Sequence, residues 1–579
     1  MWRVAVVVMA TAWALGFGYL AVVRHLAGGS HAEDLGFTDQ VIWNFLRGQW
    51  FRMSIYSGAS AWNTELDLGR VLRPDSLLAF HVEPMLLLFV PMYALGGGAV
   101  LLLVVQSAAM AAGAIPAYRL GAHLAGSPWC GVAVAAAYLL SPLGQWAVLS
   151  DFHTSTLAAP LLLLSLERLL VARKPVQALL AGALAASARE DVGPVLAVLG
   201  LVLMLTTRPR RVGLAFAALG LTWTLLSLAV IRAYSGGVTP FDVRYGATMG
   251  SGPAAILAAV SRPEVLEYAR TLLLNGGWLG LLAPLSLLPA LPSLILNALS
   301  TSPWMAAGKA HYSGLVLPFI VLGAAMSLQW LRQRPWLQLS AAITLVATSL
   351  FGYVLAGAGP FAANYAPAQV TPHSQAAERI VASLPADAAV SASTSLVPHL
   401  THRARAYVFP AVQDADFVFL DLQASPAPTS AGDVYLRVQS LLSSGEWQVD
   451  TRTDGLLLLE RSPDSPSPLP QPVNAASTLN QMPTLISAAL IPGPDGATDV
   501  DGPRWILRTT WQTDQPLPPG TRPEFWIDLD TGERLHAWDL ASLWWNPPDQ
   551  WPSGQPVTVD VPNIPERDFA AWSATWSTP

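Results

Sequence analysis

The hydrophobic pattern divides the chain near residue 357. Before this point, apolar runs alternate with short polar loops, and many of the runs are long enough to cross a bilayer core of about 30 Å as helices. Beyond it, short alternating segments typical of water-soluble domains replace the long runs. The pattern therefore predicts a polytopic α-helical membrane domain over 1–357, an α/β domain over 365–462 and a small β-sandwich over 475–579.

The first apolar run begins after Arg3 and extends for about 20 residues, which favours a retained membrane helix over a cleavable signal with an apolar core of about 7 to 15 residues. The later runs fall at 76–95, 98–117, 129–148, 155–172, 175–188, 191–207, 211–233, 273–286, 290–300, 313–331 and 337–356. Several contain Pro and Gly, which membrane helices tolerate.

Basic residues cluster in four short loops, around Arg119, Arg173, Arg210 and Arg332. By the positive-inside rule these loops are cytoplasmic. This assignment holds only if 76–95 is a re-entrant or interfacial helix and not a crossing. The expectation is then eleven crossings in a bacterial plasma membrane, with the N-terminus inside and the C-terminal domains outside.

Beyond the membrane domain, predicted helices at 373–385 and 434–445 alternate with predicted strands, and the turn at Asp454 and Gly455 joins a hairpin. This alternation indicates a small α/β domain. The proline-rich stretch RSPDSPSPLPQPV then leads to strand-like runs typical of a β-sandwich. The tryptophans of this last region suit either core packing or stacking on sugars; they include Trp526, Trp544, Trp545 and Trp551.

Composition narrows the possible partners. Hydrophobic residues make up 53% of the chain and charged residues only 12%, against about 25% charged in an average soluble protein. The net charge of -6 and the absence of a basic run argue against nucleic acid as a partner. The single cysteine, Cys130, excludes an intramolecular disulfide and a thiolate metal site.

The loops on the predicted outer side contain most of the candidate chemistry. Glu33 and Asp34 open an amphipathic helix in the stretch HAEDLGFTDQVIWNFLRGQ, where a carboxylate beside an apolar wall gains basicity and suits a general base. Arginine and lysine bind phosphate, and ionisable groups at helix ends are costly enough to indicate function. The candidate substrate-binding residues are Asp39, His81, Glu83, Asp151, His153, Glu190, Asp191, Arg244, Lys309 and His311.

Each candidate also has a purely structural interpretation. Glu33 and Asp34 fit the start of a helix, where acidic groups are favoured by the helix dipole. Buried histidines are often hydrogen-bonded core residues, and Glu190 and Asp191 suit a turn between two helices. His81 and Glu83 also suit a metal, but no HExxH or comparable spacing supports one. P-loop, GxGxxG and GxSxG motifs are missing from the sequence.

Five stretches together resemble a known family: EDLGFTDQVIWNFLRGQ, FHVEPMLLLFVPMYAL, SDFHTSTLAAPLLLL, SAREDVGPVLAV and KAHYSGLVLPFIVLGA. Over about residues 1–460 the chain resembles the bacterial membrane-protein family numbered 2079 among domains of unknown function, which is similar to the GT-C superfamily of glycosyltransferases. That superfamily uses polyprenyl-phosphate sugars at the extracytoplasmic face. The resemblance implies that Asp34, with Glu33 beside it, acts as base or metal ligand, and that Lys309, His311 and Arg244 contact the lipid phosphate.

The sequence thus predicts a membrane glycosyltransferase that moves a sugar from a polyprenyl-phosphate donor to an extracytoplasmic glycan or protein acceptor. Two other classes stay open. A lipid or sugar transporter or flippase also contains helices broken by proline and polar groups. A non-catalytic membrane protein would bind envelope glycans through its soluble domains. The sequence leaves the requirement for a divalent metal undetermined.

Overall fold

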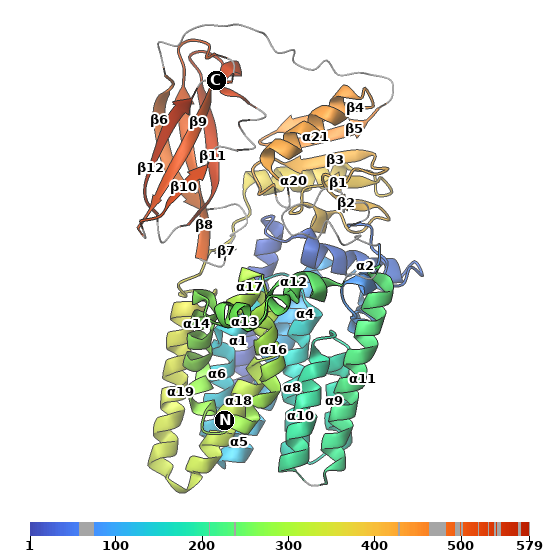
Figure 1. Ribbon diagram of the computed structural model, residues 1–579, viewed down its shortest axis with the longest axis vertical. Helices are drawn as coiled ribbons and strands as arrows, with labels where there is room; N and C mark the ends of the chain where they lie inside the picture. Colours follow the sequence, from blue (N-terminus) through green and yellow to red (C-terminus); the bar gives the residue numbers. More distant parts are fainter. Residues whose placement is uncertain are drawn as a thin grey trace. The chain divides into compact units, whose positions relative to one another are not determined.

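The structure is a computed structural model (Figure 1), and it describes residues 1–56, 75–207, 209–236, 239–426, 429–462, 482–492, 498–499, 502–518, 520–530, 532–537, 540, 543, 546–565 and 569–577. The chain forms two compact units. The first comprises Met1–His25, Phe37–Met53 and Pro74–Tyr365. The second comprises Leu26–Gly36, Ser54–Arg73, of which Ser54 to Tyr56 are described, and Ala366–Pro579.

The first unit is a helical bundle built from the apolar runs. Its described helices of eight residues or more are α1 (Trp2–Leu26), α2 (Phe37–Phe45), α4 (Ala99–Ala112), α5 (Ala114–Ala125), α6 (Pro128–Leu140), α7 (Pro142–Leu149), α8 (Thr154–Leu170), α9 (Pro175–Ala186), α10 (Val192–Thr206), α11 (Arg211–Tyr234), α12 (Pro240–Gly250), α13 (Pro253–Val260), α14 (Pro263–Leu272), α16 (Leu291–Leu299), α18 (Leu317–Trp330) and α19 (Pro335–Ala356). Close packing between α10 and α11 depends on glycine, because a Cβ at Gly200 would lie 2.2 Å from the backbone nitrogen of Ala217.

Four of the described helices are long and apolar enough to cross a membrane, or up to six if each of two bent helix pairs is one span. The uninterrupted spans are α1, the α4–α5 segment Ala99–Ala125, α11 and α19. The bent pairs are α6 with α7, at 42°, and Pro303–Ser313 with Leu317–Gln333, at 70°. The expected eleven crossings therefore stay a prediction.

Two predicted runs are broken rather than continuous. Residues 76–95 form the 3₁₀ turns Leu77–Ala79 and Pro84–Phe89 and the short helix α3 (Val90–Ala94). Residues 273–290 form a π turn, the short helix α15 (Trp278–Gly280) and two 3₁₀ turns. Gly276 causes the break in the π turn, because its φ of 94° is open to glycine and costly for other residues.

The α/β domain of the second unit has a five-stranded sheet with the order β2-β1-β3-β5-β4. Its strands are β1 (Val390–Ala392), β2 (Ala406–Val408), β3 (Phe417–Asp421), β4 (Trp447–Thr453) and β5 (Leu456–Arg461), and its helices are α20 (Pro372–Ser383) and α21 (Ala431–Ser443). Strands β2, β1 and β3 are parallel, while β5 is antiparallel to both β3 and β4. Trp447 is buried in the core of this domain.

The C-terminal region contains a three-stranded sheet in the order β10-β9-β12 and a four-stranded one in which β8 pairs with β11, β6 and β7. The strands are β6 (Thr484–Pro492), β7 (Thr498–Asp499), β8 (Gly502–Gln512), β9 (Arg522–Leu529), β10 (Arg534–Ala537), β11 (Pro556–Pro565) and β12 (Phe569–Ser577). Trp551 lies in the shared core, whereas Trp526 stacks on His536 with ring centroids 4.0 Å apart. Trp544 and Trp545 lie outside the described residues.

Candidate functional site

The first unit contains a cavity of about 250 Å³ that is lined by residues of α12 and of the loop between α9 and α10, among others. Figure 1 shows α12 at the end of the bundle opposite the basic α10–α11 and α18–α19 loops. Five of the predicted substrate-binding residues line it, although they come from four separate stretches of sequence: His81, Glu190, Asp191, Arg244 and His311. Apolar side chains complete the wall, among them Leu228, Ile231, Leu296 and Leu315. The cavity thus offers both a polar and an apolar surface to a ligand.

Arg189, in the short loop between α9 and α10, is the centre of the polar side. Its Nε lies 3.4 Å from Asp191 Oδ2 and 3.7 Å from Glu190 Oε1, and its Nη1 lies 3.0 Å from His311 Nε2. The guanidinium is buried, and burial alone would lower its pKa, but Asp191 and Glu190 raise the pKa above its usual value. The Arg189 side chain is therefore a permanent cation that is already committed to partners in the protein.

Glu190 anchors the broken segment before α3 to this loop. Its Oε1 lies 2.8 Å from His81 Nδ1, and its Oε2 accepts a hydrogen bond from the backbone nitrogen of Val82 at 3.1 Å. Burial would raise the pKa of Glu190, but His81 and Arg189 hold it below its usual range. Burial and the charge of Arg189 in turn lower the pKa of His81. Glu190 therefore holds the segment before α3 to the α9–α10 loop through the side chain of His81 and the backbone of Val82.

His153 and His311 stack on each other, with ring centroids 3.5 Å apart. Because an arginine N–H can only donate, Nε2 of His311 must accept from Arg189. In the neutral imidazole the proton of His311 is then on Nδ1. Among the described residues, this buried Nδ1 has no hydrogen-bond partner. His311 therefore presents an uncommitted donor beside the cavity that it lines.

Arg244, from α12, differs sharply from Arg189. Its Nη1 contacts the sulfur of Met305 at 3.5 Å, and within the described part of the chain this weak acceptor is the only hydrogen-bond partner of its side chain. Three other buried atoms of cavity-lining residues also lack a hydrogen-bond partner there, namely Nε of Arg189, Oδ1 of Asp191 and Oγ of Ser155. Buried polar groups are normally hydrogen-bonded. The cavity consequently combines spare donors and a spare acceptor, which suits a polar ligand.

Asp151, Glu83 and Lys309 lie outside the cavity lining. Asp151 is buried and pairs with Arg24 at 2.6 Å. Glu83 is also buried, and burial raises its pKa to about 8 despite the nearby charge of Arg189. The Nζ of Lys309 lies 5.0 Å from the ring centroid of Trp146. These three residues therefore lie near the cavity or pack against other side chains, and they do not form its wall.

Asp39, Glu33 and Asp34 belong to the predicted amphipathic helix but divide between the two units. Asp39, on α2, is buried and accepts a hydrogen bond from the hydroxyl of Tyr93. Glu33 and Asp34 lie in the π turn Ala32–Gly36 of the second unit. There, Oε2 of Glu33 accepts a hydrogen bond from the Thr394 hydroxyl at 2.6 Å. Glu33 therefore tethers the loop that follows α1 to the α/β domain.

The described residues include no group of three or more His, Cys, Asp or Glu side chains arranged to hold a metal ion. His81, Glu190 and Asp191 are the nearest approach to a donor set in the cavity, but Arg189 lies among them. A guanidinium in this position repels a cation and compensates the carboxylates itself. The arrangement thus favours an anionic ligand over a divalent metal.

Two residues central to the site were not among the predicted substrate-binding residues. Arg189 stands in the same SARED stretch as Glu190, so an arginine next to two acids was the available signal. Ser155 follows His153 in the stretch DFHTS, where a serine at the start of a helix looks like an ordinary capping residue. Only the folded chain places Ser155 beside a cavity.

The fold and the cavity define a polytopic membrane protein with a polar site at one end of its bundle. The chain belongs to the family of predicted membrane proteins DUF2079, whose model matches residues 30–458. No curated protein matches it. Among solved structures, that of ArnT from Cupriavidus metallidurans bound to undecaprenyl phosphate is similar at a TM-score of 0.42 and 14% identity, over 79% of this chain and 100% of that chain.

Proposed function

We propose that this chain is a membrane glycosyltransferase that transfers a sugar from a polyprenyl-phosphate donor to an acceptor on the extracytoplasmic side. The observation that carries the proposal is the uncommitted guanidinium of Arg244 in a cavity with one polar and one apolar wall. A guanidinium binds phosphate through paired, charge-assisted hydrogen bonds. In such a site the apolar wall suits the first isoprene units of the lipid.

The unpartnered atoms of the cavity match the chemical groups of a polyprenyl-phosphate sugar. The Nδ1–H of His311 and the guanidinium of Arg244 are donors, which match phosphate oxygens. Oδ1 of Asp191 is an acceptor, which matches a sugar hydroxyl. A fatty acid or an isolated isoprenoid would leave the acceptor without a partner, so a ligand with both phosphate and hydroxyl groups fits the cavity best.

We assign proton removal to Asp34, because its position in the sequence matches the acidic residue that the resemblance to the GT-C superfamily implies as the base. In the proposed step, an acceptor hydroxyl oxygen forms a bond with the anomeric carbon while the bond from that carbon to the phosphate oxygen breaks. The hydroxyl proton passes to the carboxylate of Asp34, and the polyprenyl phosphate leaves with the bonding electron pair.

The test is transfer of label from radiolabelled polyprenyl-phosphate sugars by the full-length protein in nanodiscs, with an envelope extract as the source of acceptors. Asp34→Asn is expected to abolish transfer while donor binding persists. Arg244→Gln is expected to weaken donor binding roughly 10- to 100-fold, since a hydrogen bond to a charged group contributes about 1.5–3 kcal/mol. Arg232→Gln, an exposed arginine outside the cavity lining, is the matched control and should bind normally.

Absence of transfer with every donor, in a protein that binds none of them, would contradict the proposal. Transfer that is unchanged in Asp34→Asn would remove that residue from its role as base. Equal losses of binding in the Arg244 and Arg232 variants would show that general surface charge, and not the cavity, attracts the donor.

A further inference from the structure

A second pocket lies in the second unit, at the edge of the sheet where parallel strands β1 and β3 end. The carboxyl ends of parallel strands are the usual position of ligand sites in open α/β sheets. The wall comprises residues of α20, the segments that follow β1 and β3, and Leu26 to Gly28 of the loop after α1. Its volume is about 30 Å³.

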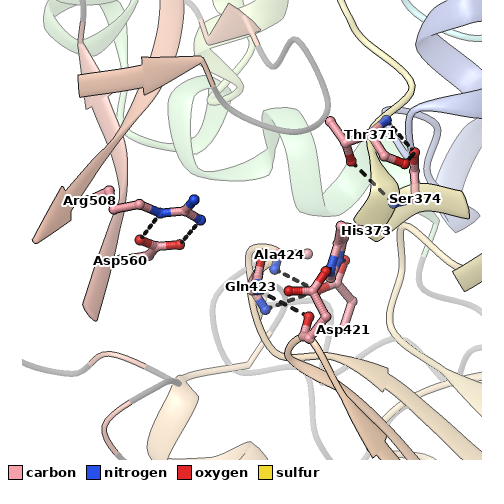
Figure 2. A network of polar contacts seen from close by, with 9 residues as sticks. Thr371, His373, Ser374, Asp421, Gln423, Ala424, Arg508 and Asp560 are labelled. Carbon is pink, nitrogen blue, oxygen red and sulfur yellow. Dashed lines mark hydrogen bonds and ion pairs between the residues drawn. The ribbon is translucent and has the colours of Figure 1, made fainter. Parts of the chain in front are cut away.

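The polar groups of this pocket are mostly committed to each other, as Figure 2 shows for His373 and Asp421. His373 lies between two carboxylates, with Nε2 3.1 Å from Asp421 Oδ2 and Nδ1 3.2 Å from Asp454 Oδ2. Oδ1 of Asp421 accepts from the backbone nitrogens of Gln423 and Ala424, at 2.9 and 3.1 Å. On the same wall, His399 pairs with Glu378 of α20.

One side chain in the pocket is not committed. The stretch after β1 contains three consecutive hydroxyls, and two of them have structural partners: Ser393 accepts from the backbone nitrogen of Asp421 at 3.0 Å, and Thr394 donates to Glu33 at 2.6 Å. The third, Ser395, is 7% exposed and lines the pocket, yet among the described residues its hydroxyl has no hydrogen-bond partner. A buried hydroxyl without a partner is expected to have one in the functional state.

The chemistry of the wall excludes an anion. The charge of His373 is compensated by Asp421 and Asp454, and Glu378 adds a further carboxylate, so the pocket is acidic overall. The start of α20 provides no anion site either, because Thr371 and Ser374 cap it reciprocally, at 2.9 and 3.2 Å (Figure 2). The ligand must therefore be neutral and rich in hydroxyls, or cationic.

The size and the apolar rim favour the neutral ligand. A water-sized group needs roughly 10–15 Å³ of cavity volume, so a pocket of about 30 Å³ admits about two hydroxyl groups. The remainder of the ligand then lies at the mouth of the pocket. Leu26, Val381 and Leu396 line it alongside the polar residues. Aliphatic side chains of this kind pack against the C–H face of a pyranose, whereas they offer nothing to a compact cation.

We propose that this pocket binds a neutral saccharide by inserting two neighbouring ring hydroxyls, one of which hydrogen-bonds to Ser395. The site is separate from the donor cavity and does not depend on the proposed transfer reaction. Its ligand class is a sugar residue of an extracellular glycan, to which the Ser395 hydroxyl can donate or from which it can accept a hydrogen bond. This assigns glycan recognition to the α/β domain.

The test is saturation-transfer-difference NMR on the full-length protein in nanodiscs, with the methyl glycosides of glucose, mannose, galactose and N-acetylglucosamine as probes. Tetrahydropyran, which has the ring but no hydroxyls, is the negative probe. At least one glycoside should receive saturation. Ser395→Ala should weaken its binding roughly 2- to 10-fold, the effect of one neutral hydrogen bond.

Ser391→Ala is the matched control. Ser391 lies on β1, is fully buried and also has no partner for its hydroxyl among the described residues, but it does not line the pocket. Binding should be unchanged in this variant and in Arg244→Gln, which disables the donor cavity. The proposal is overturned if no glycoside receives saturation, if Ser395→Ala binds like the wild type, or if Ser391→Ala has the same effect as Ser395→Ala.

Discussion

The cavity of the membrane unit and the pocket of the α/β domain share a plan but differ in the polar group that they leave for a ligand. Each has an ion-paired central cation: Arg189 near Glu190 and Asp191, and His373 between two aspartates. Each is also lined by a polar side chain that has no strong hydrogen-bond partner among the described residues. In the cavity the guanidinium of Arg244 is such a group, and in the pocket the hydroxyl of Ser395 is.

The difference between the two uncommitted groups determines the difference in ligand. A spare guanidinium selects an anion, whereas a spare hydroxyl among compensated carboxylates selects a neutral hydroxyl. We therefore expect the two kinds of residue to have different roles. Replacing an ion-paired central cation should destabilise the protein, whereas replacing Arg244 or Ser395 should change ligand binding and leave stability nearly unchanged.

The largest effect is expected for Arg189→Gln. This change leaves Glu190 and Asp191 without their common cation, although their side chains are only 17% and 28% exposed. Removing one partner of a buried ion pair costs about 3–5 kcal/mol. Thermal unfolding of the protein in nanodiscs, followed by intrinsic tryptophan fluorescence, should show a marked drop in the midpoint.

Arg244→Gln is the control for this prediction, because among the described residues its guanidinium has no hydrogen-bond partner other than the Met305 sulfur. Its stability should stay within about 0.5 kcal/mol of the wild type. If both variants lose the same stability, the distinction between the ion-paired Arg189 and Arg244 is wrong.

Many of the residues of these sites could be predicted from the sequence, but the contacts between them could not. The stretches with His81, Glu190, Arg244 and His311 were identified because charged and polar residues interrupt apolar runs. Their common cavity follows from the alternation of loops across the bundle. By contrast, Arg24 pairs with Asp151 at a separation of 127 residues, and no local pattern in a single sequence encodes such a contact.

The breaks in the helices had partial signals. The Gly276–Gly277 pair and the prolines at 284 and 292 lie in apolar runs that were expected to be crossings. Composition alone identified these runs as apolar, but a positive φ at Gly276 is a property of the folded backbone. The tether between Glu33 and Thr394 was equally hidden, since it joins a membrane-proximal loop to a domain 361 residues later.

The second largest effect is the pH dependence of the stability that His373 contributes to the α/β domain. Burial alone would lower the pKa of His373, but its hydrogen bond and charge interaction with Asp421, together with Asp454, raise it to about 9. Because the folded pKa lies above the unfolded value of about 6.5, the protonated form stabilises the fold. This stability is fully present below about pH 6.5 and is lost as pH rises through about 9.

The contribution is at most about 3.4 kcal/mol, because the pKa rises by about 2.5 and each pKa unit corresponds to 1.36 kcal/mol. It is measured as the difference in unfolding midpoint between the wild type and His373→Gln from pH 6 to pH 10. The difference should be largest at pH 6 and shrink through pH 9. A difference that is constant over this range would show that the charge of His373 does not hold α20 to β3 and the β4–β5 turn.

The smallest effects are expected at the helix starts that position the two regions. α20, which carries His373, begins with Thr371, whose hydroxyl accepts from the backbone nitrogen of Ser374 at 3.2 Å. Removal of an N-cap hydroxyl costs about 1 kcal/mol. Thr371→Ala should lower the unfolding midpoint slightly and leave donor binding unchanged, and Thr371→Ser, which restores the hydroxyl, should behave like the wild type.

α12 has the corresponding cap on the cavity side. Thr239 accepts from the backbone nitrogen of Asp242 at 3.3 Å, and Asp242 Oδ2 accepts from the Thr239 nitrogen at 2.8 Å. Here the cap orients the helix that carries the uncommitted Arg244, so Thr239→Ala should lower stability by about 1 kcal/mol and in addition weaken donor binding. Donor titrations of the Thr239 and Thr371 variants side by side measure this. If both bind the donor like the wild type, the first turn of α12 does not position Arg244, and the cavity depends on the bundle alone.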